Sequence, residues 1–265
     1  MPLRNAKPVT GRACAIALGQ IWHYLERSRR QLLIWGLAIV TGLFVVLTST
    51  GFSAANSTNF LGKSHPLPIS LNQWQDLTNS GDYFEQVKLT EVGYLIWSQF
   101  PIKVYIDSNE IRELLQVNAA VQEWSAYLPL QIVEQPEIAD ISISFQTPPL
   151  RMTNLLRARS ALTRYELYIK RLSNSVLAHR CTIILTPNQP NKYLKAAALH
   201  ELGHALGIWG HSLVTSDALY FSQVPNPPSI SARDINTLKR IYQQPTRLGW
   251  KVMGETQRVK VAKDF

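Results

Sequence analysis

Apolar residues between positions 88 and 245 recur in short and in long segments, and the two kinds predict different elements. Segments 102–106, 130–133, 138–145 and 180–185 are rich in β-branched residues and predict strands. Segment 111–127 repeats apolar residues at helical spacing, and 192–206 is helical by composition. Ser108 is expected to cap the first helix. Ser231 and Asp234 resemble a capping box before a last helix that Pro245 stops. This order predicts one α+β domain, in which strands and helices are mixed along the chain.

An uncharged segment, LLIWGLAIVTGLFVVL, runs from Leu32 to Leu47. With its flanks it approaches the ~18–20 residues that cross a bilayer as a helix. Arg27, Arg29 and Arg30 precede it, so the positive-inside rule places residues 1–30 in the cytoplasm and the rest outside. We therefore predict one N-terminal transmembrane helix within residues 31–50 and an extracytoplasmic catalytic domain. The alternatives are a signal peptide cleaved near Ala55, which yields a secreted or periplasmic protein, and a buried core helix.

Composition and charge set the remaining domain boundaries. Residues 51–87, rich in Ser, Asn, Gly and Pro, are interpreted as a linker to a folded domain at 88–245. The net charge of +9 is concentrated in residues 1–30, with six basic residues against one acidic, and in a basic tail at 246–265, with five against two. The basic side chains within 157–171 are interpreted as a solvated face. No repeated basic–aromatic pattern is present, so no nucleic-acid partner is predicted.

The chemistry is concentrated in His200-Glu201-Leu202-Gly203-His204. Positions i and i+4 of a helix lie on one face, so His200 and His204 can share one metal ion. Glu201 is about 100° round the helix from His200 and can reach a water at that metal. This HExxH pattern supplies two zinc ligands and a general base.

A third ligand is expected after the helix ends. Gly207 allows the chain to turn back, Gly210 allows another tight turn, and His211 follows. Three histidines with an open fourth position are typical of a catalytic zinc site. Asp217 is the alternative third ligand. A thermolysin-like site, with a downstream Glu as third ligand, fits worse, because no glutamate occurs between Glu201 and Glu255.

The segment HELGHALGIWGHS resembles the metzincin signature HExxHxxGxxH, and is most similar to that of the matrixins. His211 stands one residue later than that pattern has it. The metzincin methionine turn corresponds to Asp217-Ala218-Leu219-Tyr220, in which Leu219 replaces methionine. Such a swap usually costs under ~1.5 kcal/mol. The resemblance implies a zincin catalytic domain with a twisted mixed sheet, long helices and an active-site helix.

The resemblance also implies a function. We expect a membrane-anchored zinc metalloendopeptidase that hydrolyses polypeptides, with His200, His204 and His211 as zinc ligands and Glu201 as general base. Matrixins often bind Ca²⁺, for which Asp140 and Glu166 are candidates. The alternative is a catalytically inactive metzincin-like scaffold that binds a protein partner at the membrane. The shifted His211 and Leu219 favour that alternative, whereas the intact Glu201 argues against it.

Overall fold

The structure is a computed structural model that describes residues 62–149, 160–171, 175–252 and 262–264. Segments 1–30 and 31–50 lie outside these ranges, so the membrane anchor stays a prediction. Among the described residues, no helix is both long enough and apolar enough to cross a bilayer.

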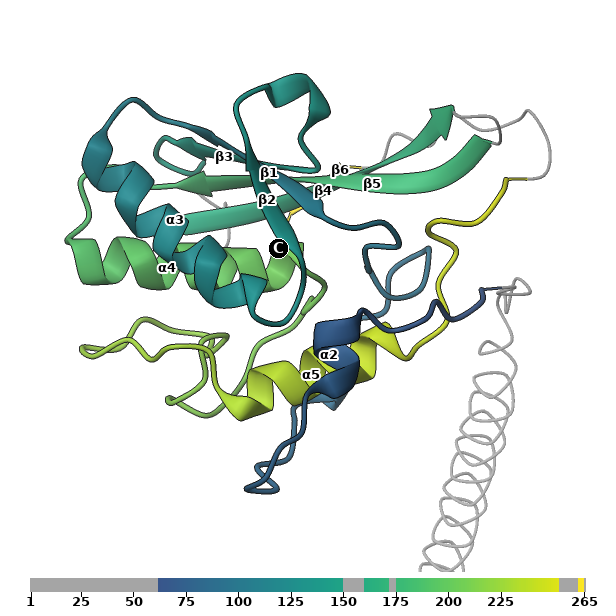
Figure 1. The fold of residues 1–265 in the computed structure, drawn as a ribbon. Coiled ribbons are helices and arrows are strands. Elements are labelled where there is room, and N and C mark those ends of the chain that lie inside the picture. Colours follow the sequence, from purple (N-terminus) through teal and green to yellow (C-terminus); the bar gives the residue numbers. More distant parts are fainter. Residues whose placement is uncertain (1–61, 150–159, 172–174, 253–261, 265) are drawn as a thin grey trace, which may run out of the picture. The chain divides into compact units, whose positions relative to one another are not determined.

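The described strands form one mixed sheet in the order β2-β1-β3-β5-β4-β6 (Figure 1). The strands β1, β2, β3 and β5 run parallel, whereas β4 is antiparallel to both β5 and β6. Their bounds are β1 Ile102–Asp107, β2 Leu130–Val133, β3 Ile141–Phe145, β4 Ala161–Arg171, β5 Ser175–Leu185 and β6 Ala262–Asp264. The predicted mixed α+β architecture is therefore confirmed.

Two long helices cover one face of this sheet, α3 at Ile111–Ser125 and α4 at Asn191–Ala205 (Figure 1). Alternate residues of β1 and β3 are buried, because successive strand residues point to opposite faces and one face meets the helices. Trp124 of α3 is fully buried, and its indole Nε1 donates a hydrogen bond to the carbonyl oxygen of Leu199 in α4, at 2.9 Å. This hydrogen bond links α4, the helix that contains His200, Glu201 and His204, to α3.

Three details of the predicted elements are wrong. Glu110 is the N-cap residue of α3, and Ser108 instead donates a hydrogen bond to the Glu113 carboxylate at 2.7 Å. The strand expected from residue 138 begins at Ile141, after the short 3-10 helix η2 at Pro136–Ile138. The segment interpreted as a solvated face contains an eleven-residue strand that was not predicted, β4, in which Arg164 and Lys170 alternate with the buried Thr163, Tyr165 and Leu167.

The last helix, α5 at Ala232–Tyr242, has the predicted capping box between Ser231 and Asp234. It packs beside the short helix α2 at Ile69–Gln73 and near the 3-10 helix η1 at Phe84–Gln86. From residue 62 the predicted linker belongs to the folded body, since Leu71 and Tyr83 are buried in its core. Thr246 and Leu248, in the predicted basic tail, are buried as well.

Candidate metal centre

The structure brings His200, His204 and His211 together. One ring nitrogen of each lies within 4.8 Å of the others. His200 and His204 project from successive turns of α4, and the ring centroid of His211 lies 5.1 Å and 5.0 Å from theirs. Among the described residues, these three form the group of side chains arranged to hold a metal ion. The extra residue before His211 therefore does not separate it from the helix pair.

Glycines shape the loop that returns His211 to the helix. Gly207 has a φ of +130°, and a Cβ there would lie 2.6 Å from the carbonyl oxygen of Leu95. At Gly210 a Cβ would collide with the backbone of Gln86. Between these glycines, the Trp209 carbonyl accepts a hydrogen bond from the amide of Lys88 at 3.0 Å. The loop can therefore pack directly against segment 86–95, and this packing fixes its path.

The backbone fixes the tautomers of the two helical histidines. Nδ1 of His200 lies 2.9 Å from the carbonyl oxygen of Ala218, and Nδ1 of His204 lies 2.7 Å from that of Ile208. Because a carbonyl oxygen only accepts, each Nδ1 carries the proton, and in a neutral ring Nε2 then keeps its lone pair. This is the usual arrangement of metal-ligating histidines, whose other nitrogen donates to a backbone or carboxylate oxygen.

The two Nε2 atoms face each other at 3.1 Å. Two lone pairs at that distance repel unless a cation lies against both. Tetrahedral Zn²⁺ with nitrogens at ~2.0–2.1 Å holds neighbouring ligands about 3.4 Å apart. The donor set therefore fits zinc with small adjustments.

Burial prepares His204 for this role. The side chain is 2% exposed, and its desolvation, followed by the nearby His200 and His211, holds its pKa well below the ordinary value. Its imidazole is consequently neutral near pH 7, which is the form that binds a metal.

Glu201 is buried beside the centre, against strand β4. The hydroxyl of Thr163 donates to its carboxylate oxygen Oε2 at 2.6 Å and lies 3.1 Å from its backbone oxygen. Thr163 is fully buried because its side chain points to the helix-covered face of β4. Thr163 was not predicted as a site residue, because β4 was not predicted. Its hydroxyl restricts the orientation of the Glu201 carboxylate.

Leu219, at the position expected for the methionine turn, packs beneath α4. It is fully buried, and a Cβ added at Gly203 would lie 2.6 Å from its Cδ2 and 3.1 Å from Cζ2 of Trp124. Gly203 therefore lets Leu219 approach the helix backbone between the two histidine turns. The leucine side chain occupies this space.

Asp234 connects α5 to the turn that holds His200. Its carboxylate accepts hydrogen bonds from the amides of Ala218 at 2.9 Å and Ser231 at 2.8 Å, and from the Tyr83 hydroxyl at 2.6 Å. The Ala218 carbonyl in turn accepts the bond from His200. Burial raises the pKa of Asp234 despite these bonds, and burial also raises the pKa of Tyr83. Asp234 thus positions the backbone behind His200.

Asp217, the alternative third ligand, has a different role. Its fully buried carboxylate accepts from the hydroxyls of Ser212 and Ser231 and forms an ion pair with Arg233 at 3.0 Å. These contacts hold the turn together and engage the carboxylate, and the group that could hold a metal ion contains His211 instead.

The residues suggested for Ca²⁺ are not gathered into a site. Glu166 forms an ion pair with Arg180 at 2.9 Å, and Asp140 accepts a hydrogen bond from the backbone amide of Lys103 at 2.9 Å. Neither belongs to a group of possible metal ligands among the described residues. Calcium is therefore unsupported.

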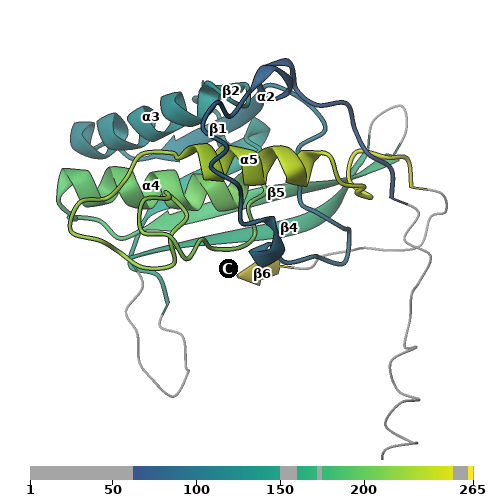
Figure 2. The ribbon, with the colours of Figure 1, turned by 90° about the horizontal axis from the view of Figure 1, so that it is seen from below.

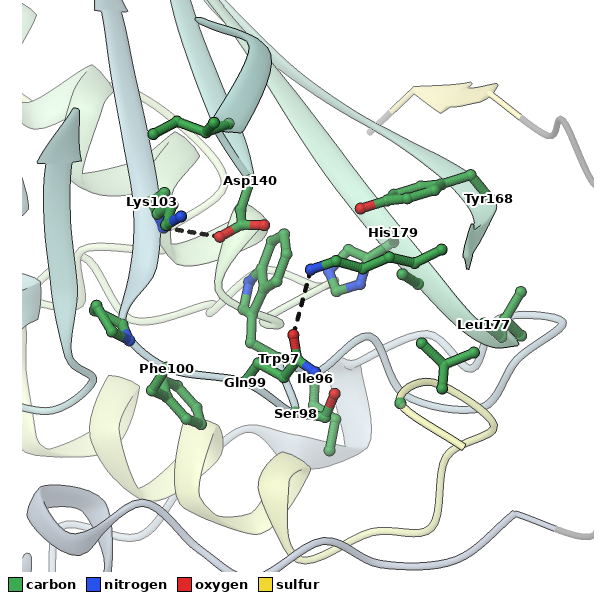
Figure 3. A pocket seen from close by; sticks show the side chains of 16 residues that line it. Ile96, Trp97, Ser98, Gln99, Phe100, Lys103, Asp140, Tyr168, Leu177 and His179 are labelled. Atoms are coloured by element: carbon green, nitrogen blue, oxygen red, sulfur yellow. Dashed lines mark hydrogen bonds between the residues drawn. The ribbon is translucent and has the colours of Figure 1, made fainter. Parts of the chain in front are cut away.

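A separate pocket of about 220 Å³ lies between segment 96–101 and the β4–β5 hairpin (Figure 3). It contains His179, which is 3% exposed and packs against Trp97 with ring centroids 3.9 Å apart. Among the described residues, Nε2 of His179 has no hydrogen-bond partner. Burial lowers the pKa of His179 to about 3, so this ring is neutral at pH 7. The three clustered histidines do not line this pocket, which is distinct from the metal centre.

No known family profile matches the sequence, and no curated protein matches it. Similar solved structures include two of myroilysin, at 14% and 15% identity with TM-scores of 0.34 and 0.35. They cover 55% and 64% of this chain and 96% and 98% of their own. High choriolytic enzyme 1, a hatching enzyme zinc-protease from Oryzias latipes, is 14% identical, with a TM-score of 0.31, and covers 64% of this chain and 98% of its own. These TM-scores are too low to assign a function to this chain.

Proposed function

We propose that this chain is a zinc-dependent endopeptidase of metzincin type. His200, His204 and His211 would hold Zn²⁺, and Glu201 would be the general base. One observation carries the proposal: two histidine Nε2 atoms face each other at 3.1 Å within a three-histidine group, with a buried carboxylate on the same helix. The finer comparison with matrixins rests on HELGHALGIWGHS and the turn that contains Leu219.

Each side chain has a distinct task in peptide hydrolysis. The bound ion would supply Lewis acidity, which polarises a carbonyl and brings the pKa of water towards ~7. Glu201 would accept a proton from the attacking water as the C–O bond forms. It would then give that proton to the amine nitrogen as the C–N bond breaks. Thr163 would hold the carboxylate in place throughout.

The scaffold alternative has no specific observation in its favour. Its two supporting features were the shifted His211 and the leucine at position 219. His211 lies within the three-histidine group, and Leu219 packs closely beneath the site helix. A binding scaffold also gives no chemical reason for a buried Glu201 next to the histidines.

Zinc content tests the proposed ligands. The chain purified without chelator should carry one zinc ion, whereas His204→Ala should lose it, because two histidines and water bind weakly. His211→Ala should weaken binding in the same way. His65→Ala is the matched control, since His65 stacks on Trp250 rather than on the three-histidine group, and should keep its zinc. Elemental analysis measures zinc per chain in each variant. A native chain that contains no zinc after supplementation would contradict the proposal.

Thr163 should affect turnover rather than metal content. Thr163→Val keeps the shape but removes the hydrogen bond to the Glu201 carboxylate. A hydrogen bond to a charged group contributes about 1.5–3 kcal/mol of stabilisation. If this stabilisation acts in the transition state, kcat should fall roughly tenfold or more, with little change in KM. Thr163→Ser keeps a hydroxyl and should restore most of the rate. Equal rates for the valine and serine variants would show that the contact has no role in turnover.

A further inference from the structure

The outer edge of β4 is covered by a short segment near the C-terminus of this chain. β6 pairs with β4 in antiparallel register, with Asp264 opposite Arg164, Lys263 opposite Tyr165 and Ala262 opposite Glu166 (Figure 2). β6 is the last strand in the sheet order, so without it the main-chain groups along this part of β4 would form an open sheet edge.

This edge adjoins the candidate metal centre. Thr163, the residue before the first pair, donates its hydrogen bond to Glu201. The ring of Tyr165, the middle paired residue, packs edge-on against Trp209 at 5.1 Å, and Trp209 lies 6.1 Å from the ring of His204. The antiparallel register directs β6 towards the Thr163 end of this edge. Any extended chain paired here therefore approaches the proposed base.

We propose that segment 262–264 is an autoinhibitory strand, which occupies the outer edge of β4 and thereby competes with any extended peptide substrate that pairs there. Strand addition depends mainly on main-chain hydrogen bonds and accepts varied sequences. One edge can pair with only one strand at a time, so β6 excludes any peptide that needs the same main-chain groups. Three paired residues form a short ladder, which suits a reversible occupant. The substrate part of this inference rests on the proposed function.

Amide hydrogen exchange tests whether β6 protects the edge of β4, and this test does not depend on catalysis. The zinc-loaded Glu201→Gln chain is compared with the same variant ending at Val261. Those amides of residues 164–166 that face β6 should exchange at least about tenfold faster in the shortened chain. Lys263→Ala is the matched control, because it changes a side chain and keeps the backbone, and its exchange should equal that of the full chain.

Peptide binding tests the competition for the edge. The probe is a fluorescein-labelled Val-Ala-Lys-Asp-Phe peptide, which copies residues 261–265. It should bind the shortened chain and bind the full chain at least about tenfold more weakly, because a tethered segment acts at a high effective concentration. With native Glu201, the shortened chain should also cleave peptides with a severalfold lower KM and unchanged zinc.

The outcomes separate this inference from the proposed function. If the full chain and the shortened chain show equal amide exchange and equal probe binding, β6 does not occupy the edge of β4. Faster exchange and tighter probe binding with an unchanged KM would overturn the competition with substrate. If neither zinc-loaded chain cleaves any peptide, the proposed function fails, whereas exchange and probe binding still decide whether β6 docks on β4.

Discussion

Glu201→Gln should abolish peptide cleavage while leaving the zinc in place. The amide keeps the shape of the side chain and can still accept the hydrogen bond from Thr163, but it cannot take a proton from water. General base catalysis contributes about 10²–10⁴-fold, so kcat should fall by at least that range with a smaller change in KM. Zinc per chain, measured on the same samples, should equal that of the native protein.

Two comparisons make this result specific. Glu113→Gln changes another buried glutamate, which lies in α3 and accepts a hydrogen bond from the Ser108 hydroxyl. This variant should cleave peptides near the native rate. A Glu201→Gln chain that loses its zinc would indicate a structural role for the carboxylate. A zinc-loaded Glu201→Gln chain that cleaves at the native rate would remove Glu201 from the chemistry.

Local signals in the sequence were enough for most of the elements that carry the site. The capping box at Ser231 and Asp234, the helix with His200 and His204, and the parallel strands each have a pattern within a few residues. β4 lacked such a pattern. Its open face carries charged residues such as Arg164, Glu166 and Lys170. These charges make the alternation of apolar and polar residues, which identifies a strand, hard to recognise in the sequence. A mixed charge pattern is compatible with both an exposed loop and a half-buried strand.

The side chains behind the site could not be predicted for a different reason. Thr163 and Glu201 are far apart in the sequence, and their contact exists only because β4 lies against α4. The hydrogen bond that the Ala218 amide donates to the Asp234 carboxylate likewise depends on the packing of α5. His211 was accessible to sequence reasoning because a glycine-bounded loop starts one turn after His204. The packing of that loop against segment 86–95 required the fold.

Gly203 is the position in the site helix where the smallest substitution should have a large effect. Its missing side chain leaves room for Leu219 and Trp124, both fully buried and both close to the helix backbone. A methyl group there would lie 2.6 Å from Leu219 Cδ2, which is too short for any real contact. The Leu219 side chain, its turn or the helix must then shift, and a shift of the turn or the helix displaces a histidine.

We therefore expect Gly203→Ala to lower the free energy of unfolding by about 3 kcal/mol, the upper end for overpacking, despite the better helix propensity of alanine. Zinc affinity should fall as well. Leu219→Ala alone should cost about 2–5 kcal/mol through the cavity it leaves. In the double variant the methyl group enters that cavity, so it should be at least ~1 kcal/mol more stable than the sum of the two single effects. Denaturant unfolding of the four chains measures this coupling. Strict additivity would mean that Leu219 does not limit the space at Gly203.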